Sequence, residues 1–583
     1  MKILLLTHAF NGLAQRLFVD LRAAGHEVSV ELDIADSVTQ EAVALWQPDV
    51  VIAPFLKRRI PESVWSTHTC LVVHPGPPGD GGPSALDWCI TRGETSWGVT
   101  VLQATGEYDA GPVRAWRAFT PRPGASKASL YRREVVKHAV AAVFEALARC
   151  TPGSTTWNSD PELPASLGRW QPLMAQSQRA IDWSVDDTSQ VLAKIRAADG
   201  FPGVGDRLFG TPAHLFDAHR ASAADLARCA AGAPGDVVAR RGPALLRLTI
   251  DGGVWIGHVR RQAATGQPTL KLAATRAFAA EAADLPELAV PLHRDADTWD
   301  ELRYREAGPA GARIGVLSFE FHNGAMSTRQ CRRLQVALSA VAARDTQVLV
   351  LDGGGEFFSN GIHLHDIEAT ALDSGSAADA SMANIEAMDD VALAILSISG
   401  RLTVSALRGN AGAGGCFLAL AADEVWAHAG VVLNPHYKNM GNLYGSEYWT
   451  YLLPRRVGAA QAQDIMRGRL PMGARQALAD GLTDAVLSND AGSFDATVEQ
   501  HALALAASPA LAQRIAAKVR QRADDEARRS LQDYRDDELR RMRLNFYGFD
   551  PSYHVARHHF VHRKPHAWTP RHLALHRQMP GRR

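Results

Sequence analysis

Two stretches of the chain alternate short apolar runs with helix-like patterns, and this alternation limits the possible folds more than any other feature. In the first stretch, within residues 1–120, the runs are KILLLT, EVSVEL, DVVIAP, CLVVH and WGVTVLQ. In the second, between residues 313 and 407, they are RIGVLSFEF, TQVLVL and LTVSAL. Because strands that alternate with helices usually pair in parallel, both stretches predict α/β domains.

The length of the chain requires more than one hydrophobic core, since single cores stop growing at about 250–300 residues. The chain has 583 residues, and its composition changes at several points. A Pro, Gly, Ser and Thr-rich stretch follows residue 150, short alternating runs such as LLRLTI follow residue 175, and charged helical patterns follow residue 500. We predict five segments: 1–150, a linker at 151–175, 176–285, 286–500, and a helical and basic extension at 501–583.

Charge and cysteine usage exclude several classes of protein. Lys and Arg together number 62, as do Asp and Glu, so the chain has no net charge that would favour nucleic acid as a partner. The six cysteines show no CxxC spacing, which suits a reduced, cytoplasmic protein. The opening run KILLLT is too short for a signal sequence or a membrane span. We expect a cytoplasmic protein whose partners include neither nucleic acid nor a membrane.

A histidine and an aspartate follow neighbouring strand-like runs in the first α/β stretch. His74 ends the run CLVVH, and Asp109 lies in the loop after WGVTVLQ. Ligands of open α/β sheets bind outside the carboxyl ends of the strands, where such a pair can assist acyl transfer. The alternative, a loop histidine and a turn-forming aspartate without chemistry, explains the spacing equally well.

The pattern around this pair resembles the 10-formyltetrahydrofolate-dependent formyltransferases. The motifs that carry the resemblance are His74-Pro75, Gly81-Gly82-Pro83 and Asp109-Ala110-Gly111. Further along, AIDWS and IRAADGFPG resemble the smaller domain of methionyl-tRNA formyltransferases. The resemblance implies a Rossmann-like formyltransferase domain and a small OB-like β-barrel, with His74 and Asp109 catalytic and Gly82 and Pro83 in the folate and formyl site.

One residue departs from the formyltransferase pattern. The family has an Asn two residues before the histidine, and this chain has Val72 there. Either another amide orients the formyl group, for which we expect Asn11 in the loop after the first strand, or formyl transfer is lost. We favour replacement by Asn11.

The glycine-rich stretch GNAGAGGCF, residues 409–417, raises a separate question of function. It lacks the Lys and the hydroxyl residue of a phosphate-binding P-loop, and no acidic residue follows at the distance that a dinucleotide site requires. Two interpretations remain: the turn presents backbone amides to a ligand, or it only allows close packing.

The wider pattern of this region resembles the crotonase (enoyl-CoA hydratase/isomerase) superfamily. The segments that carry the resemblance are NGAMS, LDGGGEFFSNGIHLHDIE, LTVSALRGNAGAGGCFLALAADEVWA and LNPHYKNMG. The resemblance implies a crotonase-like α/β domain in which the backbone N–H groups of Ile362 and Gly414 form an oxyanion hole for a coenzyme A thioester. It also implies that Gly361 and Gly415 contact coenzyme A.

The residues expected of a hydratase are missing from this region. Where that superfamily has two glutamates that manage a water molecule, this chain has Phe417 and His436. We therefore do not expect hydration of a double bond. Tyr437 and Glu447, the latter expected in a helix GSEYWTYLL, are the alternative proton-transfer groups, and burial among aromatic residues is expected to raise the pKa of Glu447. The competing interpretation makes Tyr437 a core residue and Glu447 a solvated helix residue.

From end to end the chain resembles the HypX/HoxX hydrogenase maturation factors. The segments THAFNGLAQR, LNPHYKNMG, GSEYW and FYGFDPSYHVARHHFVHRK carry this resemblance. It implies an enzyme that transfers a formyl group from 10-formyltetrahydrofolate to coenzyme A and then splits formyl-CoA into carbon monoxide and coenzyme A. Small-molecule substrates and hydrogenase maturation proteins are the partners that it implies.

The end of the chain is basic, since no acidic residue follows Asp550. We expect Arg563 and Lys564 to contact coenzyme A phosphates, although a solvated tail explains the charges as well. His558, His559 and His562 have a helical spacing, but no neighbouring Cys or acidic residue completes a ligand set, so we predict no metal site.

Two other functions remain compatible with the sequence. One is a formyltransferase for an amine or an amino sugar, with a crotonase-like domain that only binds coenzyme A. The other is a non-catalytic scaffold for hydrogenase assembly, which the substitutions Val72 and Phe417 keep open.

Overall fold

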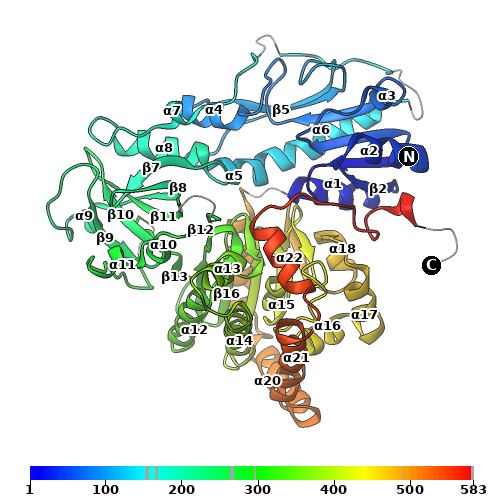
Figure 1. The fold of residues 1–583 in the computed structure, drawn as a ribbon. Helices are drawn as coiled ribbons and strands as arrows, with labels where there is room; N and C mark the ends of the chain where they lie inside the picture. Colours follow the sequence, from blue (N-terminus) through cyan, green and yellow to red (C-terminus); the bar gives the residue numbers. More distant parts are fainter. Residues whose placement is uncertain (152–156, 165–167, 263–267, 295–296, 490–491, 579–583) are drawn as a thin grey trace. The chain divides into compact units, whose positions relative to one another are not determined.

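The computed structural model describes residues 1–151, 157–164, 168–262, 268–294, 297–489 and 492–578 (Figure 1). The chain forms two compact units. The first consists of Met1–Glu287 together with the terminal segment Pro565–Arg583, and the second of Leu288–Lys564. The five segment boundaries predicted from composition remain predictions. Among the described residues, no helix combines the length and apolar character needed to cross a bilayer.

The first unit begins with a six-stranded sheet in the order β2-β1-β3-β4-β5-β6. Its strands are β1 (Lys2–Thr7), β2 (Glu27–Leu32), β3 (Val50–Phe55), β4 (Cys70–His74), β5 (Trp97–Gln103) and β6 (Val113–Phe119). The first four pair in parallel, and β5 and β6 are antiparallel to their neighbours. This confirms the α/β fold predicted for the first stretch.

Helices follow most of these strands. They are α1 (Gly12–Ala23), α2 (Asp36–Trp46), α3 (Glu62–Trp65), α4 (Ala85–Arg92), α5 (Lys127–Leu130) and α6 (Val136–Arg149). Leu13, Leu17 and Leu21 recur at four-residue spacing in α1 and are buried, so this helix covers the sheet with one apolar face.

A second domain of the same unit is a six-stranded antiparallel sheet, ordered β7-β8-β11-β10-β9 with β12 paired to β11. Its elements are β7 (Val204–Leu208), β8 (Thr211–Arg220), β9 (Val237–Arg241), β10 (Ala244–Leu248), β11 (Gly253–Arg261), β12 (Lys271–Ala273), α7 (Gln176–Arg179), α8 (Thr188–Ala198), α9 (Ala223–Leu226), α10 (Ala274–Ala277) and α11 (Ala279–Ala283). The predicted small β-rich domain is confirmed. Among the described strands no pairing joins β7 to β9, so the ladder is open there.

The carboxyl-terminal segment of the chain covers the exposed edge of the first sheet at β2. The N–H of Val30 donates to the carbonyl of Leu573 at 3.0 Å. The N–H of Leu32 donates to Thr569 Oγ1 at 2.8 Å. An edge strand has backbone N–H and C=O groups that no neighbouring strand pairs. The terminal segment forms hydrogen bonds with some of these groups of β2, although more than 500 residues separate the two in the sequence.

The second unit is built on a six-stranded sheet ordered β13-β14-β16-β19-β21-β24, parallel except for β13. Its strands are β13 (Leu302–Ala307), β14 (Ile314–Phe319), β16 (Val348–Gly353), β19 (Leu402–Leu407), β21 (Glu424–His428) and β24 (Ala485–Ser488). Val316 and Leu317 are neighbours in β14 and belong to separate apolar clusters on opposite faces of the sheet. Both faces of the sheet are therefore covered, which explains why its strands are continuous apolar runs in the sequence.

Two smaller sheets carry the glycine-rich segments. They contain β15 (Ala325–Met326) paired with β18 (Gly361–Ile362), and β17 (Phe357–Ser359), β20 (Asn410–Gly412), β22 (Val432–Asn434) and β23 (Met472–Gly473) in that order. The helices of the unit are α12 (Thr328–Ala342), α13 (Leu364–Leu372), α14 (Ala377–Leu396), α15 (Gly414–Leu420), α16 (Trp449–Val457), α17 (Ala459–Gly468), α18 (Ala474–Ala479), α19 (Phe494–Ala506), α20 (Leu511–Arg528), α21 (Leu531–Tyr547) and α22 (Ser552–Val561).

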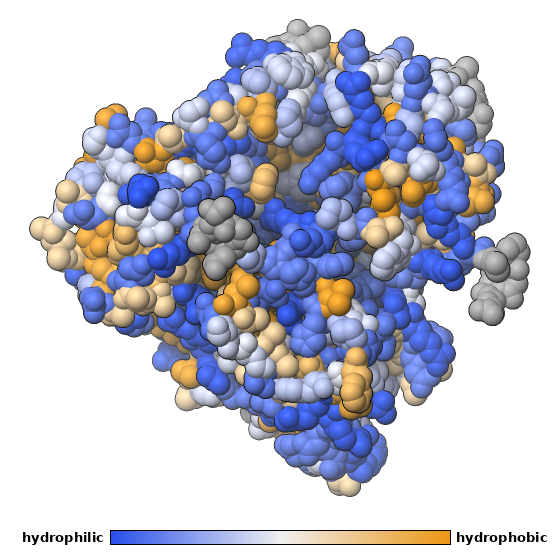
Figure 2. Space-filling model, in the orientation of Figure 1, coloured by the Kyte–Doolittle hydropathy of each residue, from blue (hydrophilic) through white to orange (hydrophobic). Residues whose placement is uncertain are grey.

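The predicted charged helices after residue 500 are α20 and α21. Leu511 is the only buried residue of α20, and the surface of this extension is largely hydrophilic in Figure 2. In contrast, α21 packs against α14, and α22 packs against α13. Residues from α14 and α21 therefore meet inside the second unit although about 150 residues separate them.

Candidate active sites

His74 lies at the carboxyl end of β4 between two carboxylates. Its Nε2 atom is 2.8 Å from Asp80 Oδ2, and its Nδ1 atom is 3.6 Å from Asp109 Oδ1. The imidazole is 4% exposed. The structure thus brings together His74 and Asp109, but not through a shared edge of parallel strands, because β5 is antiparallel to β4 and the long loop after β5 supplies Asp109.

Asp80 is a member of this group that the sequence analysis missed. A Cβ atom on Gly76 would lie 2.6 Å from His74 Nε2 and 2.8 Å from Asp80 Cγ, so only glycine at this position lets the two side chains meet. The Asp80 N–H also donates to the carbonyl of Pro77 at 2.9 Å, which closes the loop. The signal available in the sequence was the segment HPGPPGD, in which one acid ends a loop of prolines and glycines.

The loop at Gly82 and Pro83 is tied directly to Asp109. Asp109 Oδ2 accepts a hydrogen bond from the Gly82 N–H at 3.0 Å. Gly82 has φ = 100°, and a Cβ atom there would lie 3.1 Å from the carbonyl carbon of Gln171, so the turn requires glycine. Pro83 follows it and precedes α4. These residues shape the space beside His74, while contact with a folate remains a prediction.

The strands β1 and β4 run in the same direction, so their carboxyl ends lie at one edge of the sheet. Asn11 follows β1 and His74 ends β4, so both residues lie at this edge. Its Oδ1 atom caps α1 by accepting from the Ala14 N–H at 3.0 Å, and its Nδ2 atom lies 3.4 Å from the hydroxyl of Tyr131. Burial raises the pKa of Tyr131 to about 12. Val72, on β4, is half-buried and has no amide to offer.

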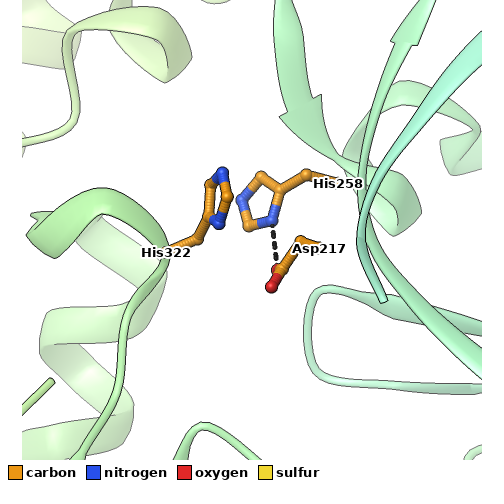
Figure 3. Close-up of side chains that lie close together, drawn as sticks. All are labelled: Asp217, His258 and His322. Atoms are coloured by element: carbon orange, nitrogen blue, oxygen red, sulfur yellow. Dashed lines mark hydrogen bonds and ion pairs between the residues drawn. The ribbon is translucent and has the colours of Figure 1, made fainter. Parts of the chain in front are cut away.

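Another pair of titratable side chains lies in the small domain. His258 on β11 is bonded through Nδ1 to Asp217 Oδ2 on β8 at 2.8 Å (Figure 3). His219 Nε2 also lies 2.9 Å from Asp217 Oδ1. This interaction links the two central strands of the antiparallel ladder.

In the second unit the glycine-rich stretch forms a turn from β20 into α15. Gly414 is the first residue of α15, so its N–H has no acceptor within the helix. Gly361 lies against it, since a Cβ atom on Gly361 would be 3.4 Å from the Gly414 nitrogen. Ile362 follows Gly361 in β18, opposite Met326 of β15. The structure therefore brings together the two segments that contain the predicted oxyanion amides.

Gly415 has the packing role that one of the two interpretations of this stretch predicted. A Cβ atom on Gly415 would lie 2.8 Å from the Cβ atom of Ser359, so glycine allows α15 to pack closely against β17. The hydroxyl of Ser359 in turn accepts a hydrogen bond from the Gly361 N–H at 3.0 Å. The stretch therefore serves close packing, and the presentation of its amides to a ligand stays a prediction.

Tyr437 and Glu447 form a buried hydrogen-bonded pair beside Gly414. The Tyr437 hydroxyl is 2.5 Å from Glu447 Oε2 and 2.7 Å from the carbonyl of Ser446. Glu447 is 1% exposed, and its Oε1 atom has no hydrogen-bond partner among the residues that the structure describes. A Cβ atom on Gly414 would lie 2.7 Å from Glu447 Cδ. The carboxyl group therefore faces the turn that contains the Gly414 amide.

The conformation expected for Glu447 is wrong. Glu447 and Tyr448 have φ values of 59° and 60°, and α16 begins only at Trp449. Buried carboxyl groups of Asp389 and Glu538 accept the N–H groups of Glu447 and Tyr448, and the positive φ values place both residues outside the helix. Burial excludes the alternative of a solvated helix residue.

Burial shifts the acidity of this pair. It raises the pKa of Glu447 to about 8, and the nearby Asp389 carboxylate adds to the shift. The pKa of Tyr437 lies well above its usual value because of burial first and the charge of Glu447 second. The raised pKa of Glu447 predicted from the sequence is confirmed. Such a group exchanges protons near neutral pH.

Arg563 and Lys564 lie exposed at the carboxyl end of α22. On the same helix, His558 Nδ1 and His562 Nε2 are 3.2 and 2.9 Å from Glu368 Oε1. Burial raises the pKa of Glu368, but hydrogen bonds from Arg557 and the histidines outweigh it and lower that pKa to about 2. The expectation that no acid accompanies the histidines is wrong, because α13 supplies one from about 190 residues away.

Comparisons with known proteins agree with this architecture. Residues 315–569 match the enoyl-CoA hydratase/isomerase family. The chain is 25% identical over 195 residues to a methionyl-tRNA formyltransferase of Geobacter metallireducens, covering 33% of this chain and 59% of that protein. The crystal structure of HypX from Aquifex aeolicus in complex with tetrahydrofolic acid matches with a TM-score of 0.91 and 43% identity, covering 100% of this chain and 99% of the other.

A full-length relative places the chain among proteins of hydrogenase assembly. The hydrogenase maturation factor HoxX of Bradyrhizobium diazoefficiens is 54% identical over 588 residues, which cover 100% of this chain and 99% of that protein. Both units and their order along the chain are included in that match. The chain belongs to the HypX/HoxX family of hydrogenase maturation factors.

Proposed function

We propose that this maturation factor makes carbon monoxide in two steps. The first unit transfers the formyl group of 10-formyltetrahydrofolate to coenzyme A, and the second splits formyl-CoA into carbon monoxide and coenzyme A. The formyltransferase relatives and the tetrahydrofolate bound to the Aquifex aeolicus protein support the first step. The enoyl-CoA hydratase/isomerase match supports coenzyme A as the carrier in the second. We place both steps in the cytoplasm, with hydrogenase maturation proteins as recipients of the gas.

In the first step the coenzyme A thiolate attacks the formyl carbon, and the carbonyl oxygen becomes negative. His74 donates a hydrogen bond to this oxygen from Nδ1, while Asp80 holds the ring through Nε2 and Asp109 lies beside it. The C–N bond then breaks, and the proton of the thiol ends on N10 of tetrahydrofolate. The products are formyl-CoA and tetrahydrofolate, and the amide of Asn11 orients the formyl group.

In the second step the Ile362 and Gly414 amides hold the thioester oxygen. Glu447 Oε1 removes the formyl proton, the C–S bond breaks as carbon monoxide leaves, and the thiolate receives a proton from the Glu447 and Tyr437 pair. The proton that leaves the formyl group ends on the sulfur of coenzyme A. The step is therefore balanced, and Glu447 returns to its starting state. Gly361 and Gly415 line the thioester side, and Arg563 and Lys564 bind coenzyme A phosphates.

The observation that carries this proposal is the buried carboxyl oxygen of Glu447, which has no hydrogen-bond partner in the described structure and faces the Gly414 turn. A buried polar atom without a partner is costly, and active sites are where such costs are retained. Phe417, in place of an acid that would bind water, keeps the surroundings apolar. Water is harmful here, because it hydrolyses formyl-CoA to formate.

The test is to incubate the purified protein with 10-formyltetrahydrofolate and coenzyme A and to follow the Soret shift of haemoglobin as it binds carbon monoxide. We expect gas from the wild-type protein, and from Glu447→Gln formyl-CoA that accumulates without gas. Gas formation by Glu447→Gln at the wild-type rate contradicts the role of Glu447. Formylation of an amine without coenzyme A contradicts the first step.

A further inference from the structure

The turn that presents Glu447 has an unfavourable backbone. Glu447 and Tyr448 are consecutive residues in the left-handed region, and neither is glycine. The Cβ atom of such a residue crowds the neighbouring carbonyl, so the conformation persists only where surrounding groups impose it. Gly445, two residues earlier, also has a positive φ of 99°. Specific contacts must therefore hold the turn from 446 to 450.

The first of these contacts comes from Asp389 on α14. Its side chain is fully buried. Asp389 Oδ1 accepts hydrogen bonds from Ser446 Oγ at 2.6 Å and from the Glu447 N–H at 2.7 Å. Asp389 Oδ2 has no hydrogen-bond partner among the described residues, and Arg535 Nε lies 3.7 Å from it.

The second contact comes from Glu538 on α21, which is also fully buried. Its Oε2 atom accepts from the Tyr448 N–H at 2.9 Å. Its Oε1 atom accepts from the Thr450 N–H at 2.8 Å and from the Thr450 hydroxyl at 2.5 Å. Together the two carboxylates take up the N–H groups of both left-handed residues.

This arrangement is expensive if its purpose is stability alone. Burying two carboxyl groups is costly even though burial raises the pKa of Asp389 to about 7 and that of Glu538 well above its usual value, and an apolar pair of the same volume avoids this cost. A glycine at either left-handed position also removes the strain at little cost. Instead, two buried acidic side chains contact the turn that carries Glu447, whose carboxyl group faces Gly414.

We propose that Asp389 and Glu538 are positioning residues of the decarbonylation site, which hold residues 446–450 in the conformation that directs Glu447 Oε1 toward the Gly414 amide. Neither touches the reacting atoms, and both act through the backbone of the turn. This inference rests on the proposed function, because it assigns the geometry of Glu447 a role in the second step.

Asp389 has a second effect, through its charge. The titratable groups that interact with Glu447 are Tyr437 from the loop after β22, Asp389 from α14, Glu538 from α21 and Cys331 from α12, and Arg535 from α21 faces Asp389. Burial raises the pKa of Glu447 first, and the negative charge of Asp389 raises it further. Asn at position 389 keeps one acceptor oxygen but loses this charge, whereas Ala loses both.

The test compares Asp389→Asn, Asp389→Ala and Glu538→Ala with the controls Glu386→Gln on α14 and Asp537→Asn on α21, both partly exposed. Carbon monoxide release from supplied formyl-CoA gives kcat, KM and the pH profile. We expect the Ala variants to lose about 100-fold in kcat, as displaced catalytic groups do, with KM within about threefold. Asp389→Asn should lose less and should move the midpoint of the pH profile to lower pH. The controls should match the wild type.

A crystal structure of Asp389→Ala separates this inference from the proposed function. We expect residues 446–450 to leave the left-handed conformation and Glu447 to turn away from Gly414, whether or not the wild type releases gas. If the Ala variants do not fold, Ser446→Ala removes one bond to Asp389 and should give a smaller loss of the same kind. Unchanged kcat in the Ala variants, or an unchanged turn in the crystal, overturns the inference.

Discussion

The ring of Phe417 stacks on the ring of Tyr437, with centroids 5.2 Å apart and planes inclined by 13°. Phe417 is fully buried, at a position where the crotonase-like pattern of the sequence predicts an acid. The contact keeps the phenol ring in place beside Glu447 and excludes water from one side of it. Phe417 thus packs against the proposed proton-transfer pair.

Replacing Phe417 by Ala should therefore change the products as well as the stability. We expect water to enter and the yield to move from carbon monoxide toward formate, measured by haemoglobin binding and by NMR. The free energy of unfolding should fall by about 3–5 kcal/mol, as for other buried Phe→Ala changes. Phe417→Tyr, which keeps the stack, is the matched control. An unchanged ratio of gas to formate in Phe417→Ala argues against water exclusion by this ring.

The raised pKa of Glu447 gives the second step a defined pH dependence. If ionised Glu447 removes the formyl proton, the rate should rise about tenfold per pH unit below pH 8 and level off above it.

The stability of the protein should change with pH in the opposite direction. The native state binds the Glu447 proton more tightly than the unfolded chain, so the stability due to this group is present below the usual carboxyl pKa and is lost as pH rises toward 8.

Chemical denaturation at several pH values checks this stability change. In Glu447→Gln the fall in stability between the usual carboxyl pKa and pH 8 should be smaller than in the wild type. An identical slope in both proteins shows that the carboxyl group of Glu447 does not titrate in this range.

Tyr437→Phe should separate the proton-transfer role of this residue from its packing. The ring and its stack on Phe417 stay, while the hydroxyl that donates to Glu447 Oε2 is lost. We expect kcat for gas release to fall by about 100-fold or more. The cost in stability should be about 1–3 kcal/mol, because a buried acceptor loses its donor. Stopped-flow haemoglobin assays and thermal unfolding measure the two effects. A normal kcat limits Tyr437 to packing.

Substitutions at the first site should stop the first step alone. We expect His74→Ala and Asp80→Asn to lower formyl-CoA formation by about 10²–10³-fold, because a donor to the developing oxyanion is lost or misplaced. Both variants should release gas from supplied formyl-CoA at the wild-type rate. Mass spectrometry of formyl-CoA, with Asp36→Asn on α2 as a control, tests this. Loss of gas release from supplied formyl-CoA contradicts the division of labour.

The attachment of the terminal segment should depend on pH through Glu31. Burial raises the pKa of Glu31, but hydrogen bonds from His576, Thr569 and Arg577 outweigh it and lower that pKa. The stability due to Glu31 is therefore present above the usual carboxyl pKa and is lost as pH falls below it. The protection factors of the β2 amides, which correct for the slower intrinsic exchange in acid, should fall as pH drops in the wild type. In Glu31→Gln they should be low already at neutral pH. Equal exchange in both proteins contradicts this role.

Much of the architecture could be predicted because its signals are local. Apolar runs and the glycines between them located the strands of both α/β sheets, and His74 and Asp109 were found because each ends or follows such a run. Their contact could not be derived in this way, because β5 runs antiparallel to β4. Tyr437 and Glu447 were found from neighbouring segments of a recognisable motif. Their hydrogen bond and the burial of Glu447 followed from the tertiary structure.

The sequence by itself thus determined the order of the elements and which residues stand in the two candidate sites, including Phe417 and His436, where the crotonase-like pattern predicts acids. Only the tertiary structure decided that Asp80 joins His74, that Glu368 meets the histidines of α22, and that Asp389 and Glu538 bend the backbone at Glu447 away from a helix. These contacts join helices and loops that local patterns do not relate. The physical reason is that a buried carboxyl group needs hydrogen-bond donors to offset the loss of water. Folding can bring these donors from any distance along the chain.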